Sequence, residues 1–160
     1  MVQLISNFTA AATAATLLRI LDIRKDHAFD VTEAGCTDLT PVQSYSAATV
    51  GNQAWALVGG PLSFQIVSFC NTFLTYPGAQ TGAIALRSQA TTHPVASSSW
   101  IISLVNPAIP TGPWNIIEEA SNTYLTVWDQ VVATQGQGTP ITLEDGNPDD
   151  IRQQFWFIAA

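Results

Sequence analysis

A Gln-x-Trp motif recurs along this chain at spacings that restrict the folds it can adopt. The motif occurs as Gln53-x-Trp55, as a degraded copy at Ser98-x-Trp100, and as Gln154-x-Trp156. A matching triplet precedes each copy, and the step from the middle of the triplet to the Trp is 25, 25 and 30 residues. The triplets are Phe29-Asp30-Val31, Leu74-Thr75-Tyr76 and Leu125-Thr126-Val127. Three concordant spacings predict a threefold internal repeat.

A third set of matching segments lies further upstream. Their Ile residues precede the triplet centres by 10, 9 and 10 residues, and the segments are Leu18-Arg19-Ile20, Phe64-Gln65-Ile66 and Trp114-Asn115-Ile116. The predicted repeats span approximately residues 16–58, 59–105 and 106–158, with residues 1–15 as an N-terminal extension. The whole chain, 1–160, is expected to form a single domain.

Short runs of alternating apolar and polar residues, separated by Gly and Pro, indicate strands rather than helices. Each repeat shows four such runs, so we predict an all-β fold of about twelve short strands. In the second repeat the expected third strand is Ala83–Ser88. The Ala/Thr run that ends at Ala15 fits either a short helix or a coil, and residues 1–5 fit an edge strand.

Units of this size cannot each bury an apolar face, so the three must close around a shared core. We expect the Trp of each repeat at that core, namely Trp55, Trp100 and Trp156. Trp114 matches Phe64 and is also expected to be buried. Trp128 has no counterpart in the other repeats and is expected to be exposed.

The charge of the chain argues against two classes of partner. Charged residues make up 11% of the chain and the formal net charge is −7, with five basic residues scattered along it. Without a basic stripe, the chain is not expected to bind nucleic acid or anionic membranes. Its apolar runs are far shorter than the roughly 20 residues that span a bilayer, so membrane insertion is not expected.

The two cysteines, Cys36 and Cys70, lie at non-equivalent positions of different repeats. No secretory leader is visible, so we predict a cytoplasmic location. In a reducing compartment both cysteines are expected to be free thiols, with a bridge between them as the alternative.

The repeats carry a resemblance to a known family. Threefold repeats with a Gln-x-Trp near each end resemble the ricin-B-type β-trefoil lectins, and the wording Thr40-Pro41-Val42…Asn52-Gln53-Ala54-Trp55 is similar to the cytoplasmic ricin-B-like lectins of mushrooms. The resemblance covers residues 16–158. It implies a β-trefoil fold and the binding of galactose- or N-acetylgalactosamine-type glycans in shallow pockets, up to one per repeat.

Residue by residue, the resemblance places one complete sugar site in the first repeat. Its members are Asp30, Gln43, Tyr45, Asn52 and Gln53. A carboxylate and amides can bond adjacent sugar hydroxyls, and an aromatic face can cover the apolar side of the ring. The alternative for Asp30 is that it caps a turn.

The other two repeats lack the key groups of this site. Repeat two has Thr75 in place of Asp30, no aromatic residue between Ala83 and Ala90, and Ser97-Ser98 in place of Asn52-Gln53. Repeat three has Thr126 for Asp30, Glu144 for the aromatic residue and Gln153 for Asn52. We therefore expect both of these sites to be vacant, and the two Thr residues indicate that the fold itself does not need a carboxylate there.

Catalysis has little support in the sequence. His27 and His93 have no Cys or carboxylate spaced like metal ligands, and no cofactor motif is present, so neither a metal, a cofactor nor an enzyme is predicted. The acidic pairs are adjacent in sequence and would face opposite sides of a strand.

Two functions stay open. One is a lectin that acts as a homodimer or larger oligomer, because avidity strengthens weak single sites. The other is a protease inhibitor that uses the loops Thr91–Ser99 and Gly146–Arg152.

Overall fold

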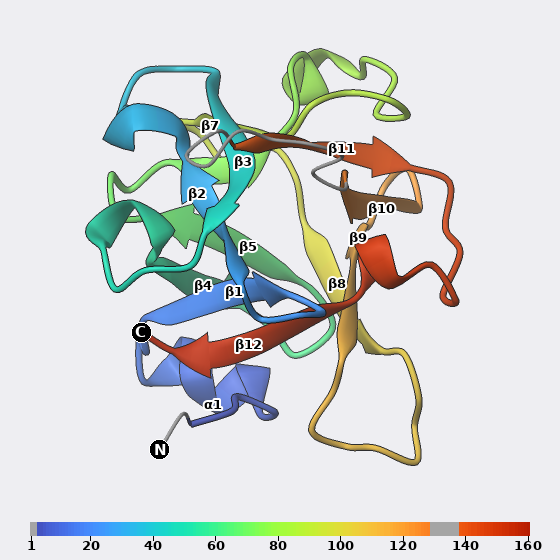
Figure 1. Cartoon of the computed structure of the whole chain (residues 1–160). Helices are drawn as coiled ribbons and strands as arrows, with labels where there is room; N and C mark the ends of the chain where they lie inside the picture. Colours follow the sequence, from blue (N-terminus) through green and yellow to red (C-terminus); the bar gives the residue numbers. More distant parts are fainter. Residues whose placement is uncertain (1–2, 129–137) are drawn as a thin grey trace.

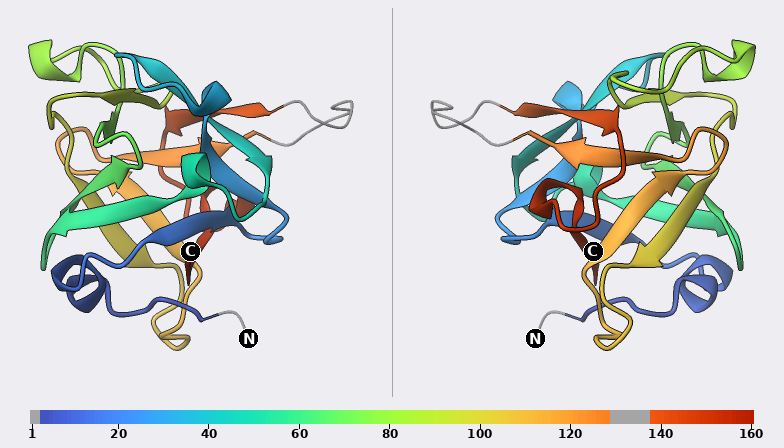
Figure 2. Two further views of the ribbon diagram at one scale, coloured as in Figure 1. Left: turned by 90° about the vertical axis from the view of Figure 1, so that its left-hand side faces the viewer. Right: turned by 90° about the vertical axis from the view of Figure 1, so that its right-hand side faces the viewer.

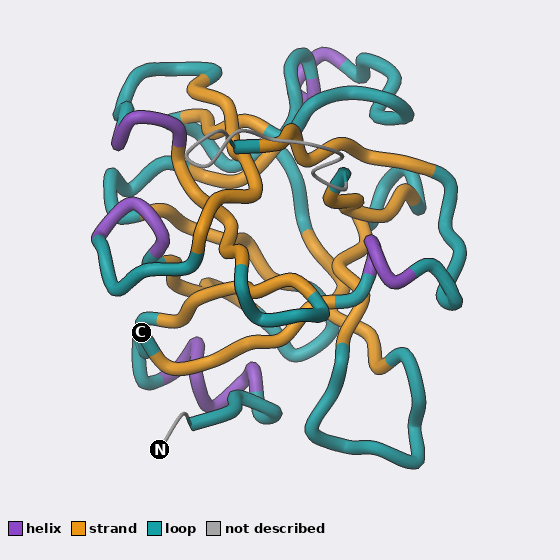
Figure 3. Tube along the Cα trace, in the orientation of Figure 1, coloured by secondary structure: helices purple, strands orange, loops and turns teal. Residues whose placement is uncertain are grey.

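The computed structural model describes residues 3–128 and 138–160, and most of the chain is short strand and loop (Figures 1 and 3). The described part contains one α-helix, α1 (Phe8–Thr13), and the 3-10 turns η1 (Thr32–Ala34), η2 (Gly51–Gln53), η3 (Ala79–Thr81) and η4 (Ile151–Gln153). The twelve strands found in the described residues confirm the predicted all-β class. They are β1 (Leu18–Asp22), β2 (His27–Val31), β3 (Thr40–Ser46), β4 (Trp55–Gly59), β5 (Phe64–Ser68), β6 (Phe73–Thr75), β7 (Thr91–His93), β8 (Trp100–Leu104), β9 (Trp114–Glu118), β10 (Thr123–Val127), β11 (Thr139–Glu144) and β12 (Phe155–Ala159).

Half of the strands form a closed barrel. β1 pairs with β12 and β4, β4 pairs with β5, β5 with β8, β8 with β9, and β9 pairs with β12 to close the ring. Closure leaves these strands without a free edge. Alternate residues of each strand point inward, which is why the sequence alternates.

The remaining strands form three hairpins that cover one end of the barrel (Figure 1). The hairpins are β2–β3, β6–β7 and β10–β11, one from each repeat. β3 also pairs with β7 and with β11, so the hairpin of repeat one joins the other two. A six-stranded barrel capped by three hairpins is the β-trefoil architecture that the resemblance to ricin-B-type lectins implied.

Equivalent strand pairs reveal the true alignment of the repeats. Leu18 pairs with Trp55, Phe64 with Trp100, and Trp114 with Phe155. The counterpart of Trp55 in repeat three is therefore Phe155, one residue before the predicted Trp156. In a strand, a shift of one residue moves the side chain to the opposite face.

Burial confirms two of the three predicted core tryptophans and corrects the third. Trp55 and Trp100 are fully buried, and their Nε1 atoms donate to the equivalent carbonyls of Phe29 (3.0 Å) and Leu74 (3.1 Å). Trp156 is only half-buried, and its Nε1 donates to the Ile23 carbonyl in the β1–β2 turn. Two further predictions are confirmed, because Trp114 is buried and Trp128 is 39% exposed.

The N-terminal extension closes the other end of the barrel, where α1 lies below β12 and away from the hairpins (Figures 1 and 2). The side chain of Asn7 caps the helix by accepting a hydrogen bond from the Ala10 amide. Phe8 packs edge-on against Phe64, Trp114 and Phe157. The Ala/Thr run is thus a helix, and the expected edge strand is reduced to a bridge between Leu4 and Ile158.

The third strand of repeat two lies later in the chain than predicted. It is β7 (Thr91–His93), whereas the predicted segment Ala83–Ser88 holds turns and an Ile84 side chain that is 81% exposed. Alternation alone suggested the wrong segment, because the position of this strand is fixed by its pairing with both β6 and β3.

The cysteines form a disulfide bond, so the prediction of free thiols is wrong. Cys36 follows η1 and Cys70 lies in the β5–β6 turn, with their Cα atoms 5.5 Å apart. Their non-equivalent sequence positions concealed this proximity, which arises where the loop after η1 in repeat one meets the second repeat. Within residues 3–128 and 138–160, no helix is long and apolar enough to cross a bilayer.

Candidate functional site

The first hairpin and the turn before β4 bring the predicted site residues together. Asp30 on β2 stands directly opposite Gln43 on β3. Tyr45 lies two residues further along β3, on the same face as Gln43. The short turn η2 then places Asn52 and Gln53 beside the carboxylate of Asp30.

The centre of this cluster is a buried carboxylate surrounded by amides. Asp30 is 3% exposed, and its Oδ1 accepts from Gln43 Nε2 at 3.1 Å. Its Oδ2 accepts from Asn52 Nδ2 at 2.8 Å and from Gln53 Nε2 at 3.0 Å. These donors compensate the lost hydration of the carboxylate. A carboxylate offers about four acceptor positions, so one position on Oδ1 is left for a ligand hydroxyl.

Gln53 fixes the position of the Asp30 carboxylate and of the loop after β3. It is 1% exposed, its Oε1 accepts from the Ala48 amide, and its Nε2 donates to the Ser46 carbonyl as well as to Asp30. All of its donors are used by the protein. Gln53 therefore holds the loop after β3 and orients Asp30 from behind.

A cavity of about 350 Å³ opens in front of the cluster. Its lining combines four predicted residues with three that sequence reasoning missed: Asp30, Gln43, Tyr45 and Asn52, with Thr32, Glu33 and Gly138. We call it the repeat-one pocket. Thr32 lies two positions after Asp30, a spacing that could have identified it, whereas Gly138 comes from the third repeat and gave no sequence signal. A side chain at Gly138 would collide with Gln43.

The equivalent position in repeat two is filled by hydroxyl groups. The Thr75 hydroxyl is hydrogen bonded to those of Ser97 (2.9 Å) and Ser98 (2.8 Å). The strand register places His93 where Tyr45 stands in repeat one, so an aromatic ring is present there, contrary to the prediction. The carboxylate is nonetheless missing.

Repeat three departs from the predicted alignment. Gln153, and not Gln154, takes the place of Gln53, because its Nε2 donates to Thr126 Oγ1 and to the Asp145 carbonyl. Arg152 therefore replaces Asn52. Its guanidinium pairs with Asp150 and lies over the ring of Trp128, 4.8 Å from the centroid.

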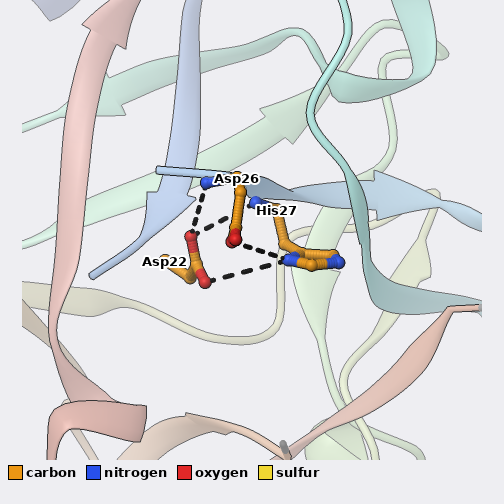
Figure 4. Close-up of side chains that lie close together, drawn as sticks. All are labelled: Asp22, Asp26 and His27. Atoms are coloured by element: carbon orange, nitrogen blue, oxygen red, sulfur yellow. Dashed lines mark hydrogen bonds and ion pairs between the residues drawn. The ribbon is translucent and has the colours of Figure 1, made fainter. Parts of the chain in front are cut away.

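A second polar cluster lies in the β1–β2 turn (Figure 4). The Nδ1 atom of His27 is 2.8 Å from Asp26 Oδ1 and 3.9 Å from Asp22 Oδ2, so two carboxylates lie beside this ring although the sequence spacing did not suggest a metal-ligand pattern. Asp22 Oδ1 also accepts from the backbone amides of Asp26 and His27. Burial raises the pKa of Asp22. Burial also acts to raise the pKa of Asp26, but hydrogen bonds with His27 and Asp22 outweigh it and leave that pKa below its ordinary value. These three groups could in principle hold a cation, although a proton on Nδ1 satisfies the same contacts.

Comparison with protein-family models and with curated proteins finds no match. Among solved structures, the designed threefold-symmetric protein ThreeFoil aligns with a TM-score of 0.75 and 17% identity, covering 90% of this chain and 99% of that one. The agglutinin of Rhizoctonia solani aligns with a TM-score of 0.74 and 15% identity over 91% of this chain and 96% of its own. The ricin B-like lectin of Macrolepiota procera, solved in complex with lactose, aligns with a TM-score of 0.72 and 15% identity, covering 91% of this chain and 96% of its own. The chain thus has the β-trefoil fold that ricin B-like lectins, mushroom lectins among them, also adopt.

Proposed function

We propose that this chain is a lectin that binds galactose- or N-acetylgalactosamine-type glycans in the repeat-one pocket. One observation carries the proposal: a buried carboxylate without a cationic partner among the described residues lies at the back of an open cavity beside a tyrosine. Asp30 is ringed by amides, while its counterparts Thr75 and Thr126 are uncharged. The fold thus closes without a carboxylate at the two equivalent places, which favours a ligand-binding role for Asp30 over a structural one.

The groups that face the repeat-one pocket match the chemistry of a pyranose. Asp30 offers an acceptor for a ligand hydroxyl, and the amides of Gln43 and Asn52 supply further polar atoms at fixed positions. Tyr45 provides an aromatic face for the apolar side of the ring. The resemblance to ricin-B-type lectins favours a galactose-type sugar, and the lactose complex of the Macrolepiota procera lectin is consistent with that choice. Binding without catalysis is the proposed activity.

Calorimetry with N-acetylgalactosamine and lactose tests the proposal. Tyr45→Ala removes the aromatic face without breaking any side-chain hydrogen bond among the described residues, and it should weaken binding about fivefold or more, since aromatic contacts are worth about 1 kcal/mol. His93→Ala changes the equivalent position of repeat two and should leave affinity unchanged. If Tyr45→Ala and His93→Ala bind as tightly as the wild type, the repeat-one pocket is not the sugar site.

The protease-inhibitor alternative gains no specific support. In the first of its two expected loops, Thr91–His93 is strand β7, paired with β6 and β3. The second loop folds back on itself, because Gln153 accepts from the Asn147 amide and Asp150 pairs with Arg152. A protease panel on the same sample separates the two functions.

Assembly as a homodimer or larger oligomer is part of the proposed function. The support is a set of exposed apolar side chains, of which Leu62 (83%), Ile84 (81%) and Val95 (61%) are the most open. Light scattering at micromolar concentration tests it, and a single-chain mass would contradict it. A cytoplasmic location stays a prediction, and the Cys36–Cys70 disulfide argues against it, since disulfides persist mainly in oxidising compartments.

A further inference from the structure

A second cavity, of about 230 Å³, lies between the first and third repeats. We call it the inter-repeat pocket. Its walls come from the β1–β2 turn, from β3 and from the β10–β11 hairpin, and its lining residues are Asp22, Arg24, His27, Ser44, Val127, Trp128 and Thr139. None of these residues lines the repeat-one pocket.

Strand β3 separates the two pockets. Gln43 and Tyr45 line the repeat-one pocket, whereas Ser44 lines the inter-repeat pocket. This division follows from the strand itself, in which consecutive side chains point to opposite faces. The two cavities therefore lie on opposite sides of one strand and can be occupied independently.

One hydroxyl group in the inter-repeat pocket is buried without a partner, and a second lies directly across the strand pair from it. Thr139 stands opposite Ser44 across the β3–β11 pair, and its buried Oγ1 has no hydrogen bond. Ser44 is 2% exposed, and it also lines the pocket. Buried polar groups in proteins are nearly always paired, with protein, water or ligand. Two adjacent hydroxyls that face one cavity indicate a hydroxyl-bearing occupant.

The other residues that line the inter-repeat pocket also suit a ligand with hydroxyl groups. Asp22 uses Oδ1 for the backbone of its turn and keeps Oδ2 as an acceptor. Trp128 presents a 39% exposed indole whose position is fixed by a hydrogen bond from Nε1 to Thr142 Oγ1. The carboxylate of Asp22 and the exposed guanidinium of Arg24 offset each other, which favours a neutral ligand over a phosphate or sulfate. The volume suits a ligand smaller than drug-sized molecules.

From these observations we propose that the inter-repeat pocket is a second saccharide site, which binds one neutral pyranose unit between repeats one and three. The proposal rests on the proposed function only for its ligand class, because its residues are separate from those around Asp30. Two sites on one chain would allow a single molecule to crosslink glycans.

Nitrogen-15 NMR titration of the full chain with galactose, N-acetylgalactosamine, glucose and mannose tests both pockets at once. The indole N–H signal of Trp128 reports on the inter-repeat pocket, and the side-chain amide of Asn52 reports on the repeat-one pocket. We expect at least one sugar to shift the Trp128 signal in a saturable way. Ser44→Val fills the pocket and should weaken that response at least tenfold, and Ser44→Ala should retain the fold since no hydrogen bond between described residues is lost.

Thr92→Val is the matched control for Ser44→Val. Thr92 occupies the equivalent position of repeat two, is fully buried, and has a hydroxyl without a partner, but it lies outside the inter-repeat pocket. The Thr92→Val variant should leave the response of the Trp128 signal to sugar unchanged. A Trp128 signal that no sugar shifts, or a shift that survives Ser44→Val, overturns the second site. A shift of Trp128 without one of Asn52 would instead overturn the proposed function and leave the second site standing.

Discussion

Truncation of neighbouring aromatic residues in β12 distinguishes the structural alignment of the repeats from the one suggested by the Gln-x-Trp motif. In the structure, Phe155 is the core residue of repeat three and Trp156 lies on the other face of the same strand. The motif alone assigns the core position to Trp156. The structural alignment therefore predicts that Phe155→Ala is the more destabilising of the two variants, whereas the motif alignment predicts that Trp156→Ala is.

The magnitudes follow from burial and contacts. Phe155 is fully buried and packs edge-on against Phe29 with centroids 5.1 Å apart, so Phe155→Ala should cost about 3–5 kcal/mol of unfolding free energy. Trp156 is half-buried, donates one hydrogen bond to Ile23, and carries the Lys25 ammonium 4.1 Å from its ring centroid. Such a hydrogen bond and an exposed cation–π contact are each worth about 1 kcal/mol or less, so Trp156→Ala should cost about 1–2 kcal/mol.

Urea unfolding followed by far-ultraviolet circular dichroism measures both variants, with the disulfide kept oxidised. Because a loss of 3–5 kcal/mol can unfold a marginal domain, Phe155→Leu and Trp156→Leu provide milder versions of the same comparison. Trp55→Ala is the positive control, since Trp55 is fully buried at the equivalent position of repeat one. A Trp156 variant that is destabilised as much as the Phe155 variant would refute the structural alignment.

Three further predictions concern stability. The loop closed by Cys36 and Cys70 spans 34 residues, so replacing both by Ser should lower the free energy of unfolding by about 3–4 kcal/mol on the chain-entropy estimate, measured by urea titration; an unchanged midpoint would contradict the bond. Phe8→Ala removes the ring that plugs the barrel and should cost about 3–5 kcal/mol, whereas a wild-type melting curve would show that α1 is not part of the core. Hydrogen bonds from Arg152 hold the pKa of Asp150 below its ordinary value, so this carboxylate stabilises the fold above the unfolded pKa of about 3.9 and loses that effect as pH falls through the lower folded pKa. Asp150→Asn should therefore melt below the wild type at pH 7 and converge with it in strong acid, and a difference independent of pH would contradict the pairing.

The repeat spacings were sufficient to predict three equivalent units around a shared core, because they record a geometric constraint. Segments that begin at Leu18, Phe64 and Trp114 all become first strands of the barrel, since each pairs with the fourth strand of its own repeat. The sequence was less informative where adjacent identical residues allow two alignments of a repeat. Gln153 and Gln154 are adjacent, and only the hydrogen bonds of Gln153 with Thr126 and the Asn147 amide identify it as the counterpart of Gln53.

The candidate site, too, could be predicted only in part from the sequence. Residues within one repeat could be predicted, because alternation in β3 and the position of η2 place Gln43, Tyr45 and Asn52 around Asp30. Contributions from other repeats could not, since Gly138 reaches the repeat-one pocket only through the pairing of β11 with β3. The disulfide between repeats was missed for the same reason.

A crystal structure of the chain soaked with N-acetylgalactosamine tests the central claim most directly. The proposal predicts a sugar in the repeat-one pocket, with a hydroxyl hydrogen bonded to Asp30 Oδ1, a contact to Asn52, and the ring against Tyr45. No sugar is expected at the equivalent positions around Thr75 and Thr126. Density for the sugar at either of those two positions, or an empty repeat-one pocket at saturating sugar, would contradict the account.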